Sequence, residues 1–296
     1  MKLNLIIEKI KDFHLLDKRK KKRIILDNLL YIVMAAAMCA VIIVLFFILI
    51  YILRSQAGFL NWSFLTSVEA GVFPMIVTTV YLVIVSIAVA LPIGLATAIF
   101  LNEYSGNSSI IRILRLAVET LAGIPSIIYG LFGLIVFCRT IGFGQSIIAG
   151  ALTLSIMILP VIIRATEESL KSIPDTFREG SLSLGTTKLQ TTLFVVLPSA
   201  LPGILTSVIL AIGRVVGESA PVLLTVGLST NLPHSIFESG RTLTIHLFYL
   251  TTEAVRPEDF GIAFATASVL VIMVVVINTA TKILTYCFRR KMGDIA

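Results

Sequence analysis

Charged residues are scarce in this sequence. Only 14% of its 296 residues are Asp, Glu, Lys or Arg, and 57% are hydrophobic, whereas about a quarter of a soluble domain is charged. This composition excludes an ordinary soluble domain. Cysteine is sparse too: Cys39, Cys138 and Cys287 lie far apart, without the spacings typical of zinc sites or disulfide frameworks. We therefore expect these thiols to pack as small apolar side chains.

Motifs for nucleotide binding and catalysis are also missing. The GxxxxGK[ST] pattern of a P-loop does not occur. We find no convincing nucleophile–base pair, metal-ligand cluster or internal repeat in the sequence. The chain is therefore predicted to be no enzyme and to hold no metal or cofactor, and any ATP-driven process would need a separate ATPase chain.

Long apolar runs are what the sequence does contain. A helix needs about 20 apolar residues to cross the hydrocarbon core of a bilayer. Six such stretches are predicted, at 29–53, 72–101, 116–137, 146–163, 197–228 and 261–286. The second and fifth are long enough to tilt, or to break at Pro92 and Gly94 or at Gly213 and Gly217. The sequence thus predicts an all-α integral membrane protein with about six transmembrane helices.

Lysine and arginine are unevenly divided between the two sides of this predicted bundle. With the N-terminus inside, the cytoplasmic segments carry 19 basic residues and the external segments carry 4, while Arg214 lies within a span. Cytoplasmic loops of membrane proteins are enriched in Lys and Arg, so both termini are predicted to be cytoplasmic. The basic run Lys18–Arg23 is then expected to anchor the first span at anionic lipid, not to bind nucleic acid.

The predicted organisation has two loops that are longer than simple connectors. We expect the first apolar helix to be retained in the protein, because its charged leader is too long for a signal peptide. The predicted parts are a basic cytoplasmic segment 1–28, a first transmembrane helix 29–53, a core of five spans 54–288 with a cytoplasmic loop 164–196 and an external loop 229–260, and a cytoplasmic tail 289–296.

The cytoplasmic loop 164–196 contains a helix-compatible stretch at 175–190. Asp175 is the expected N-cap and Gly185 is expected to break the helix. A short helix of this kind could be a connector, or it could dock into a groove of a partner protein.

The external loop holds an apolar segment, 243–250, that is too short to span a membrane. A re-entrant or interfacial helix fits this length. We expect His246 within it to be a packing or interfacial residue and not a ligand.

Two charged residues lie inside the fifth predicted span. Arg214 and Glu218 are four residues apart, so we expect them to share one helix face and to pair. A charge at membrane depth costs at least about 2.5–3.5 kcal/mol, and such residues normally face a bundle interior or a water-filled path. The alternative is an ion pair that only pins neighbouring helices. Arg164, which ends the fourth span, could snorkel to the inner surface or form a second cationic station on an anion path.

The cytoplasmic loop carries a spaced motif. Glu179, Gly180 and Ser181 are followed after three residues by Gly185, and nine residues later by Val195–Pro198. This spacing resembles the EAA loop of ABC-importer permeases, in which Glu-Ala-Ala, Gly and Ile-x-Leu-Pro stand at the same intervals. The resemblance implies a coupling helix that sits in a groove of a cytoplasmic ATPase.

Further segments are similar to the permeases of phosphate importers. These segments are 90–94 with Glu103-Tyr104, 121–130, 159–167 and 214–221. The resemblance, which is closest to the A-type permease subunit, implies a type I ABC importer permease fold that moves inorganic phosphate into the cytoplasm by alternating access. It places Arg214, Glu218 and Arg164 on the substrate path, where a guanidinium can bind oxyanion oxygens through two parallel bonds.

The same resemblance implies a set of partners and a location. The partners are a second homologous permease, a cytoplasmic ATPase dimer that binds the ATP, an extracellular or periplasmic phosphate-binding protein and membrane lipid. The location is the plasma membrane of a bacterium or archaeon. Three alternatives remain: a permease for sulfate, molybdate or phosphonate, a secondary transporter, which would not need an EAA loop, and an intramembrane enzyme, which would need a polar catalytic cluster on facing helices.

Overall fold

The computed structural model describes residues 18–55, 58–69, 71–105, 109–254 and 257–293, and every regular element in these ranges is a helix. The chain divides into two compact units, residues 1–55 and residues 56–296. The greater part of the predicted basic segment 1–28 and the end of the predicted tail lie outside the described residues.

The first unit consists, in its described part, of the single helix α2 (Lys18–Ser55). It is longer at both ends than the predicted span 29–53. Its apolar portion Leu26–Ser55 is long enough to cross a membrane. Large apolar side chains such as Ile32 and Phe47 are exposed along it, as a lipid-facing helix requires.

The second unit contains all the other described helices. In chain order these are α3 (Trp62–Thr66), α4 (Phe73–Ile99), the π-helical η1 (Phe100–Tyr104), α5 (Ser109–Gly123), α6 (Ser126–Gly133), the π-helical η2 (Leu134–Thr140), α7 (Ile147–Lys171), α8 (Asp175–Ser183), α9 (Lys188–Thr191), the π-helical η3 (Thr192–Val196), α10 (Leu197–Gly217), α11 (Ala220–Thr225), α12 (Leu243–Thr252) and α13 (Pro257–Gly293).

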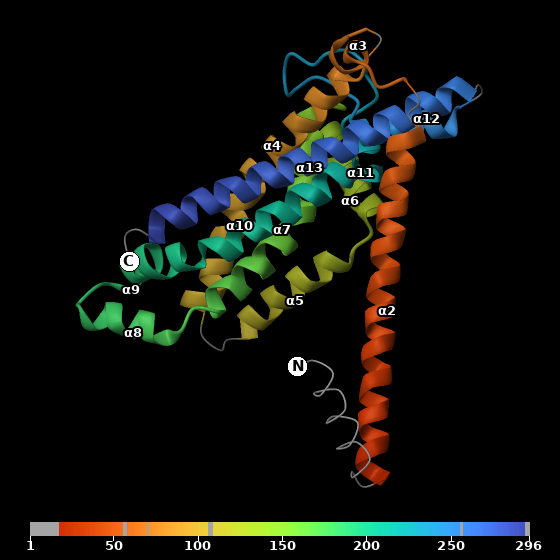
Figure 1. The fold of residues 1–296 in the computed structure, drawn as a ribbon. Helices are drawn as coiled ribbons and strands as arrows, with labels where there is room; N and C mark the ends of the chain where they lie inside the picture. Colours follow the sequence, from red (N-terminus) through yellow and green to blue (C-terminus); the bar gives the residue numbers. More distant parts are fainter. Residues whose placement is uncertain (1–17, 56–57, 70, 106–108, 255–256, 294–296) are drawn as a thin grey trace. The chain divides into compact units, whose positions relative to one another are not determined.

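Helix α7 forms the core of the second unit and packs against both α4 and α10 (Figure 1). In its most apolar window 67% of the residues are buried, more than in any other candidate span of the described chain. Small residues allow the close approach of α4: a Cβ added at Gly94 would lie 2.7 Å from Cγ2 of Ile162. Ser155 on α7 also donates a hydrogen bond to the carbonyl of Ser86 on α4, at 3.0 Å. Such contacts replace the hydrophobic driving force that helices lack inside lipid.

The third predicted span, 116–137, is not one straight helix. Helices α5 and α6 with η2 meet at a bend of 100°. The break falls at Ile124-Pro125, because a residue before proline avoids the helical conformation and proline offers no N–H to continue the ladder. Five single helices of the described chain are long and apolar enough to span, and this bent pair makes six if it counts as one, in agreement with the predicted number.

The fifth predicted span, 197–228, is also interrupted. Its apolar helix begins earlier, at Lys188, and ends at Gly217. Glu218 and Ser219 lie outside helices, and α11 follows. Pro221 has no N–H with which to bond the carbonyl of Gly217, which favours the end of α10 at this point. By contrast, α4 runs unbroken through Pro92.

Within the second unit the helix ends gather into two groups (Figure 1). Helices α8 and α9 lie at one end, together with the C-terminal ends of α4, α7 and α13. Helices α3 and α12 lie at the other. We call these the coupling end and the outer end, after the predicted coupling helix and the predicted external loop that they contain.

Candidate functional site

The predicted cytoplasmic helix is present as α8. It ends at Ser183, and Gly185 follows its C-cap Leu184 with a φ of +84°. The predicted break at Gly185 is therefore confirmed. The predicted N-cap is wrong: Pro174 occupies that position with extended backbone, and Asp175 is the first residue inside the helix. Its carboxylate is not used as a cap but lies 3.0 Å from the guanidinium of Arg178.

The four residues of the EAA-like motif do not share one environment. Glu179 and Gly180 are exposed, and a Cβ added at Gly180 would meet nothing within 4 Å. Ser181 faces inward instead. Its hydroxyl lies 2.8 Å from that of Thr186 and 3.0 Å from that of Thr191, which ties α8 to α9. The small residue at this position thus serves a hydrogen-bonded turn.

Gly185 makes the reversal between α8 and α9. Its positive φ is readily adopted by glycine and costs other residues energy. A Cβ there would meet nothing within 4 Å, so backbone conformation, and not crowding within this chain, calls for glycine. Next to this turn α8 and its C-cap expose three large apolar side chains, Phe177, Leu182 and Leu184.

Arg178 fastens α8 to the helix bundle, although the sequence analysis did not single it out. Its Nη2 donates to Oε1 of Glu103 in η1 at 2.8 Å and to the carbonyl of Leu170 at 2.9 Å. Its Nη1 donates to the carbonyl of Ile173 at 2.9 Å. The hydrogen bonds to Glu103 are the main reason why the pKa of Arg178 is raised, so the guanidinium remains charged.

Arg214 and Glu218 form the predicted ion pair, but not on one helix. Arg214 lies in the last turn of α10, whereas Glu218 caps that helix with an extended backbone. The Nε of Arg214 is 3.6 Å from Oε1 of Glu218, and 34% and 17% of the two side chains are exposed. The distance between the two charged groups is thus long for an ion pair, the residues are close in sequence, and both side chains are partly exposed.

The helix break beside this pair is supported from two other helices. Thr244 on α12 donates to the carbonyl of Val216 at 2.8 Å, which satisfies a group that the break releases. On α6, a Cβ added at Gly130 would lie 2.7 Å from the Cα of Pro221. The helices that follow the two breaks, α11 after α10 and α6 after α5, therefore pack together, as discontinuous helices do around membrane-embedded sites.

Space is open on the Arg214 side of α10. A Cβ added at Gly213 or at Gly217 would meet nothing within 4 Å in this chain. Small residues of this kind let another backbone or an anion approach a helix closely.

Arg164 has a separate partner. Its guanidinium lies 3.4 Å from Glu119 on α5, with about half of each side chain exposed. Beside it, Arg115 of α5 lies 3.1 Å from Glu167 of α7. Arg164 thus cross-links α7 and α5, and its place on an anion path remains a prediction.

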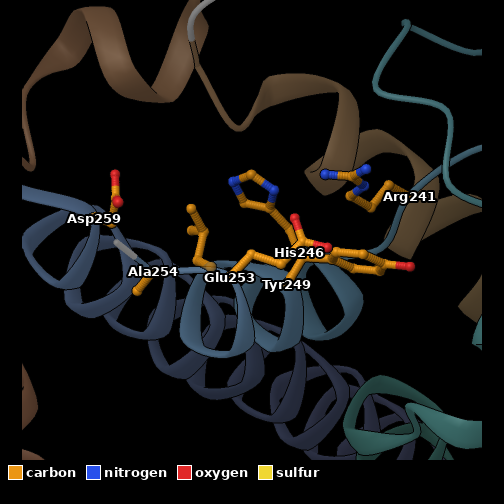
Figure 2. A pocket seen from close by; sticks show the side chains of 7 residues that line it. Arg241, His246, Tyr249, Glu253, Ala254 and Asp259 are labelled. Carbon is orange, nitrogen blue, oxygen red and sulfur yellow. The ribbon is translucent and has the colours of Figure 1, made fainter. Parts of the chain in front are cut away.

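The outer end carries a pocket of about 200 Å³ along one side of α12 (Figure 2). Arg241 lies over the ring of Tyr249, with its Cζ 5.1 Å from the ring centroid, and Glu253 also lines the pocket. His246 is half-buried there, and its Nδ1 has no hydrogen-bond partner among the described residues. Burial, aided by the charge of Arg241, lowers the pKa of His246 to about 4, so the ring is neutral at physiological pH.

The segment 243–250, predicted to be a re-entrant or interfacial helix, is indeed helical as part of α12. His246 is half-buried within it, and its role as a packing or interfacial residue stays a prediction. Among the described residues no group of three or more His, Cys, Asp or Glu side chains is placed to hold a metal ion.

Solved structures with a similar fold are ABC importers. An inward-facing MetNI methionine ABC transporter matches 77% of this chain and 99% of its own, with a TM-score of 0.59 and 19% identity. A bacterial alginate ABC transporter with an alginate-bound periplasmic protein matches 93% and 98%, with a TM-score of 0.65 and 16% identity. These likenesses show the predicted type I ABC importer permease fold.

Sequence relatives agree with the fold. A probable ABC transporter permease protein, YqgI of Bacillus subtilis, is 33% identical over 82% of this chain and 89% of its own length. The phosphate transport system permease protein PstA 1 of Mycobacterium tuberculosis is 39% identical over 75% and 72%. The family model described as "Binding-protein-dependent transport system inner membrane component" matches residues 90–294. The chain therefore belongs to the family of inner membrane permease components of binding-protein-dependent transport systems.

Proposed function

We propose that this permease moves inorganic phosphate into the cytoplasm, as the A-type member of a pair of permease subunits. Relatives from Mycobacterium tuberculosis and Mycobacterium leprae that carry the name of phosphate transport permeases are 39% identical over 70% or more of this chain. Within the matched region, Arg214 provides the kind of group that phosphate requires: a planar guanidinium that can form two parallel bonds to oxyanion oxygens.

The observation that carries the proposal is the long ion pair at the break after α10. At 3.6 Å between Arg214 and Glu218, with a third of the Arg214 side chain exposed, the guanidinium retains donors for a passing anion. Glu218 competes with the anion for those donors, which prevents the station from becoming a trap. In alternating access the permease pair opens outward and inward in turn, and nucleotide shifts this equilibrium only through its different affinities for the two states. The anion then needs a site that holds it between the two openings.

ATP is bound by separate subunits in this proposal. The ATPase dimer docks on α8, where Phe177, Leu182 and Leu184 are exposed beside the exposed Glu179 and Gly180. An amphipathic helix that lays such side chains into a groove is a common mode of recognition. This chain then contributes neither the nucleotide site nor the hydrolytic chemistry.

The remaining partners follow from the two ends of the bundle. A second, homologous permease completes the pathway, and a phosphate-binding protein delivers the anion at the outer end. Both termini and α8 are cytoplasmic, as the distribution of basic residues predicts.

Accessibility labelling in intact cells tests this orientation. A cysteine at Ser183, which is exposed at the end of α8, should react only after the membrane is opened, whereas one at Ser235 in the external loop should react from outside. Labelling of Ser183→Cys by an impermeant reagent in intact cells would reverse the topology.

Phosphate uptake in a strain that lacks this chain, with and without complementation, tests the substrate. We expect uptake of labelled phosphate to return with the complementing chain. Excess unlabelled phosphate should compete with this uptake, whereas sulfate, molybdate and phosphonate should not. Restored uptake of one of those other oxyanions, with no effect on phosphate, would assign the permease to that anion. Recovery of an ATPase bound to the purified chain separates both cases from a secondary transporter.

A further inference from the structure

The pair Arg178–Glu103 is the most enclosed ion pair among the described residues. Only 18% of the arginine side chain and 6% of the glutamate side chain are exposed. Removing two charges from water costs several kcal/mol per ion, which is recovered only with excellent geometry and further hydrogen bonds. Here both conditions hold, because Nε and Nη2 both reach the carboxylate, and Nη1 and Nη2 also donate to two backbone carbonyls and to Asp175.

This pair lies at the junction of three segments. Arg178 belongs to α8, Glu103 to η1 at the coupling end of α4, and the carbonyl of Leu170 that also binds the guanidinium belongs to the last turn of α7. A second contact follows one residue later: the Nζ of Lys188 on α9 lies 5.3 Å from the ring centroid of Tyr104. The coupling end of α4 is thus held by both short helices of the cytoplasmic loop.

Helix α4 continues from this junction to the outer end without a break. There the hydroxyl of Thr79 accepts a hydrogen bond from the backbone N–H of Leu243, at 3.1 Å. Leu243 opens α12, and the next residue, Thr244, donates to the Val216 carbonyl at the end of α10. A continuous series of contacts therefore joins α8, through α4 and α12, to the break that holds Arg214 and Glu218.

We infer that Arg178 and Glu103 are positioning residues that transmit movement of α8 to α4, and through α12 to the helix break. The inference rests on the proposed docking of an ATPase on α8. A shift of α8 must carry η1 with it, because separating the pair would leave two enclosed charges unpaired. A single exposed salt bridge would separate instead, since surface ion pairs contribute little free energy.

The ratio of anion transported to ATP hydrolysed tests this role. The complete complex, with ATPase, second permease and binding protein, is reconstituted in liposomes, and uptake and hydrolysis are measured together. Glu103→Gln, which keeps the shape but removes the charge, should lower the anion moved per ATP about tenfold while hydrolysis continues. Arg178→Lys, which keeps the charge but loses the fork, should give an intermediate ratio.

Asp175→Asn is the matched control. Asp175 binds the same guanidinium at 3.0 Å, but 85% of its side chain is exposed, so its loss should leave the ratio within about twofold of the wild type. The double variant Glu103→Gln/Arg178→Lys should move no less anion per ATP than the single variant with the lower ratio, because both changes break the same contact.

Two results would overturn the inference. One is a wild-type ratio in both Glu103→Gln and Arg178→Lys. The other is loss of complex assembly in both, which would make the pair a folding element. The ratio is measured with whichever oxyanion the wild-type complex takes up. A wrong phosphate assignment is therefore seen already with the wild-type complex, whereas a wrong role for the pair is seen only when the variants are compared with it.

Discussion

Two ion pairs in this permease are built in opposite ways. Arg214 and Glu218 are four residues apart, 3.6 Å from atom to atom and partly exposed. Arg178 and Glu103 are 75 residues apart, 2.8 Å from atom to atom and nearly enclosed. The second pair is also fixed by hydrogen bonds from Arg178 to two backbone carbonyls. A group that must exchange partners with a passing anion suits the first design, and a group that must transmit force suits the second.

The largest effect is expected at the loose pair. Arg214→Gln keeps bulk and hydrogen bonding but removes the charge, and we expect phosphate uptake to fall about a hundredfold, since a charged hydrogen bond contributes about 1.5–3 kcal/mol and each 1.4 kcal/mol is tenfold. Uptake is measured alongside complex yield and ATPase activity. Near-normal uptake would refute the charged station. Loss of assembly would favour the alternative in which the pair only pins helices.

Glu218→Gln should have a smaller effect of the same kind. Without the competing carboxylate, Arg214 holds the anion more tightly or loses its orientation, so uptake should fall about tenfold. Initial uptake rates at several phosphate concentrations distinguish these causes: tighter holding lowers both the maximum rate and the half-saturating concentration, whereas lost orientation of Arg214 raises the half-saturating concentration. An unchanged rate at all concentrations would show that Glu218 does not moderate Arg214.

At the coupling end, the comparison extends to two glycines. Gly185 has a φ of +84°, whereas Gly180 is helical with open space at its Cβ. Gly185→Ala should cost about 1–2 kcal/mol in the turn and reduce ATPase association by about tenfold. Gly180→Ala is the matched control and should stabilise α8 by up to about 1 kcal/mol. Copurification of ATPase with each variant measures the difference, and equal recovery would contradict it.

The sequence predicted the features that depend on neighbours along the chain. The number of apolar runs, the helix before Gly185 and the Arg214–Glu218 pair all follow from local spacing. The 100° bend did not: the two helices that meet at Ile124-Pro125 together are apolar enough for a span, so apolar length alone hid it. The break after Gly217, by contrast, was among the alternatives that the sequence offered. Similarly, Pro92 stays within a helix while Pro221 helps to end one, because the surrounding helices determine which freed backbone groups are satisfied.

The tight pair could not be predicted from spacing, because tertiary packing alone brings its members together. Glu103 lies in a segment that resembles phosphate permeases, and Arg178 stands directly before the EAA-like motif, but neither resemblance pairs them. The break at Gly185 could be predicted from the sequence, but the positive φ that favours glycine there is seen only in the structure.

The smallest effect is expected at the outer end, on the pH dependence of stability, where the imidazole of His246 is half-buried and its Nδ1 has no hydrogen-bond partner among the described residues. The pKa of His246 is lowered from 6.5 to about 4 by burial, so the unfolded chain binds a proton more readily than the folded one. Stability from this site is therefore complete above about pH 6.5 and is lost as the pH falls toward 4. Replacing the ring by His246→Phe removes this loss.

We therefore expect the melting temperature of the purified wild-type complex to fall by about 2 °C more between pH 7.5 and pH 5 than that of the His246→Phe complex. His234→Phe is the matched control, because His234 is an exposed histidine of the same outer loop, and it should follow the wild type. Thermal unfolding of the three complexes at both pH values measures the difference. Parallel pH dependence in wild type and His246→Phe would show that water reaches the ring in the folded complex, and that the outer end encloses His246 less than the bundle encloses Arg178 and Glu103.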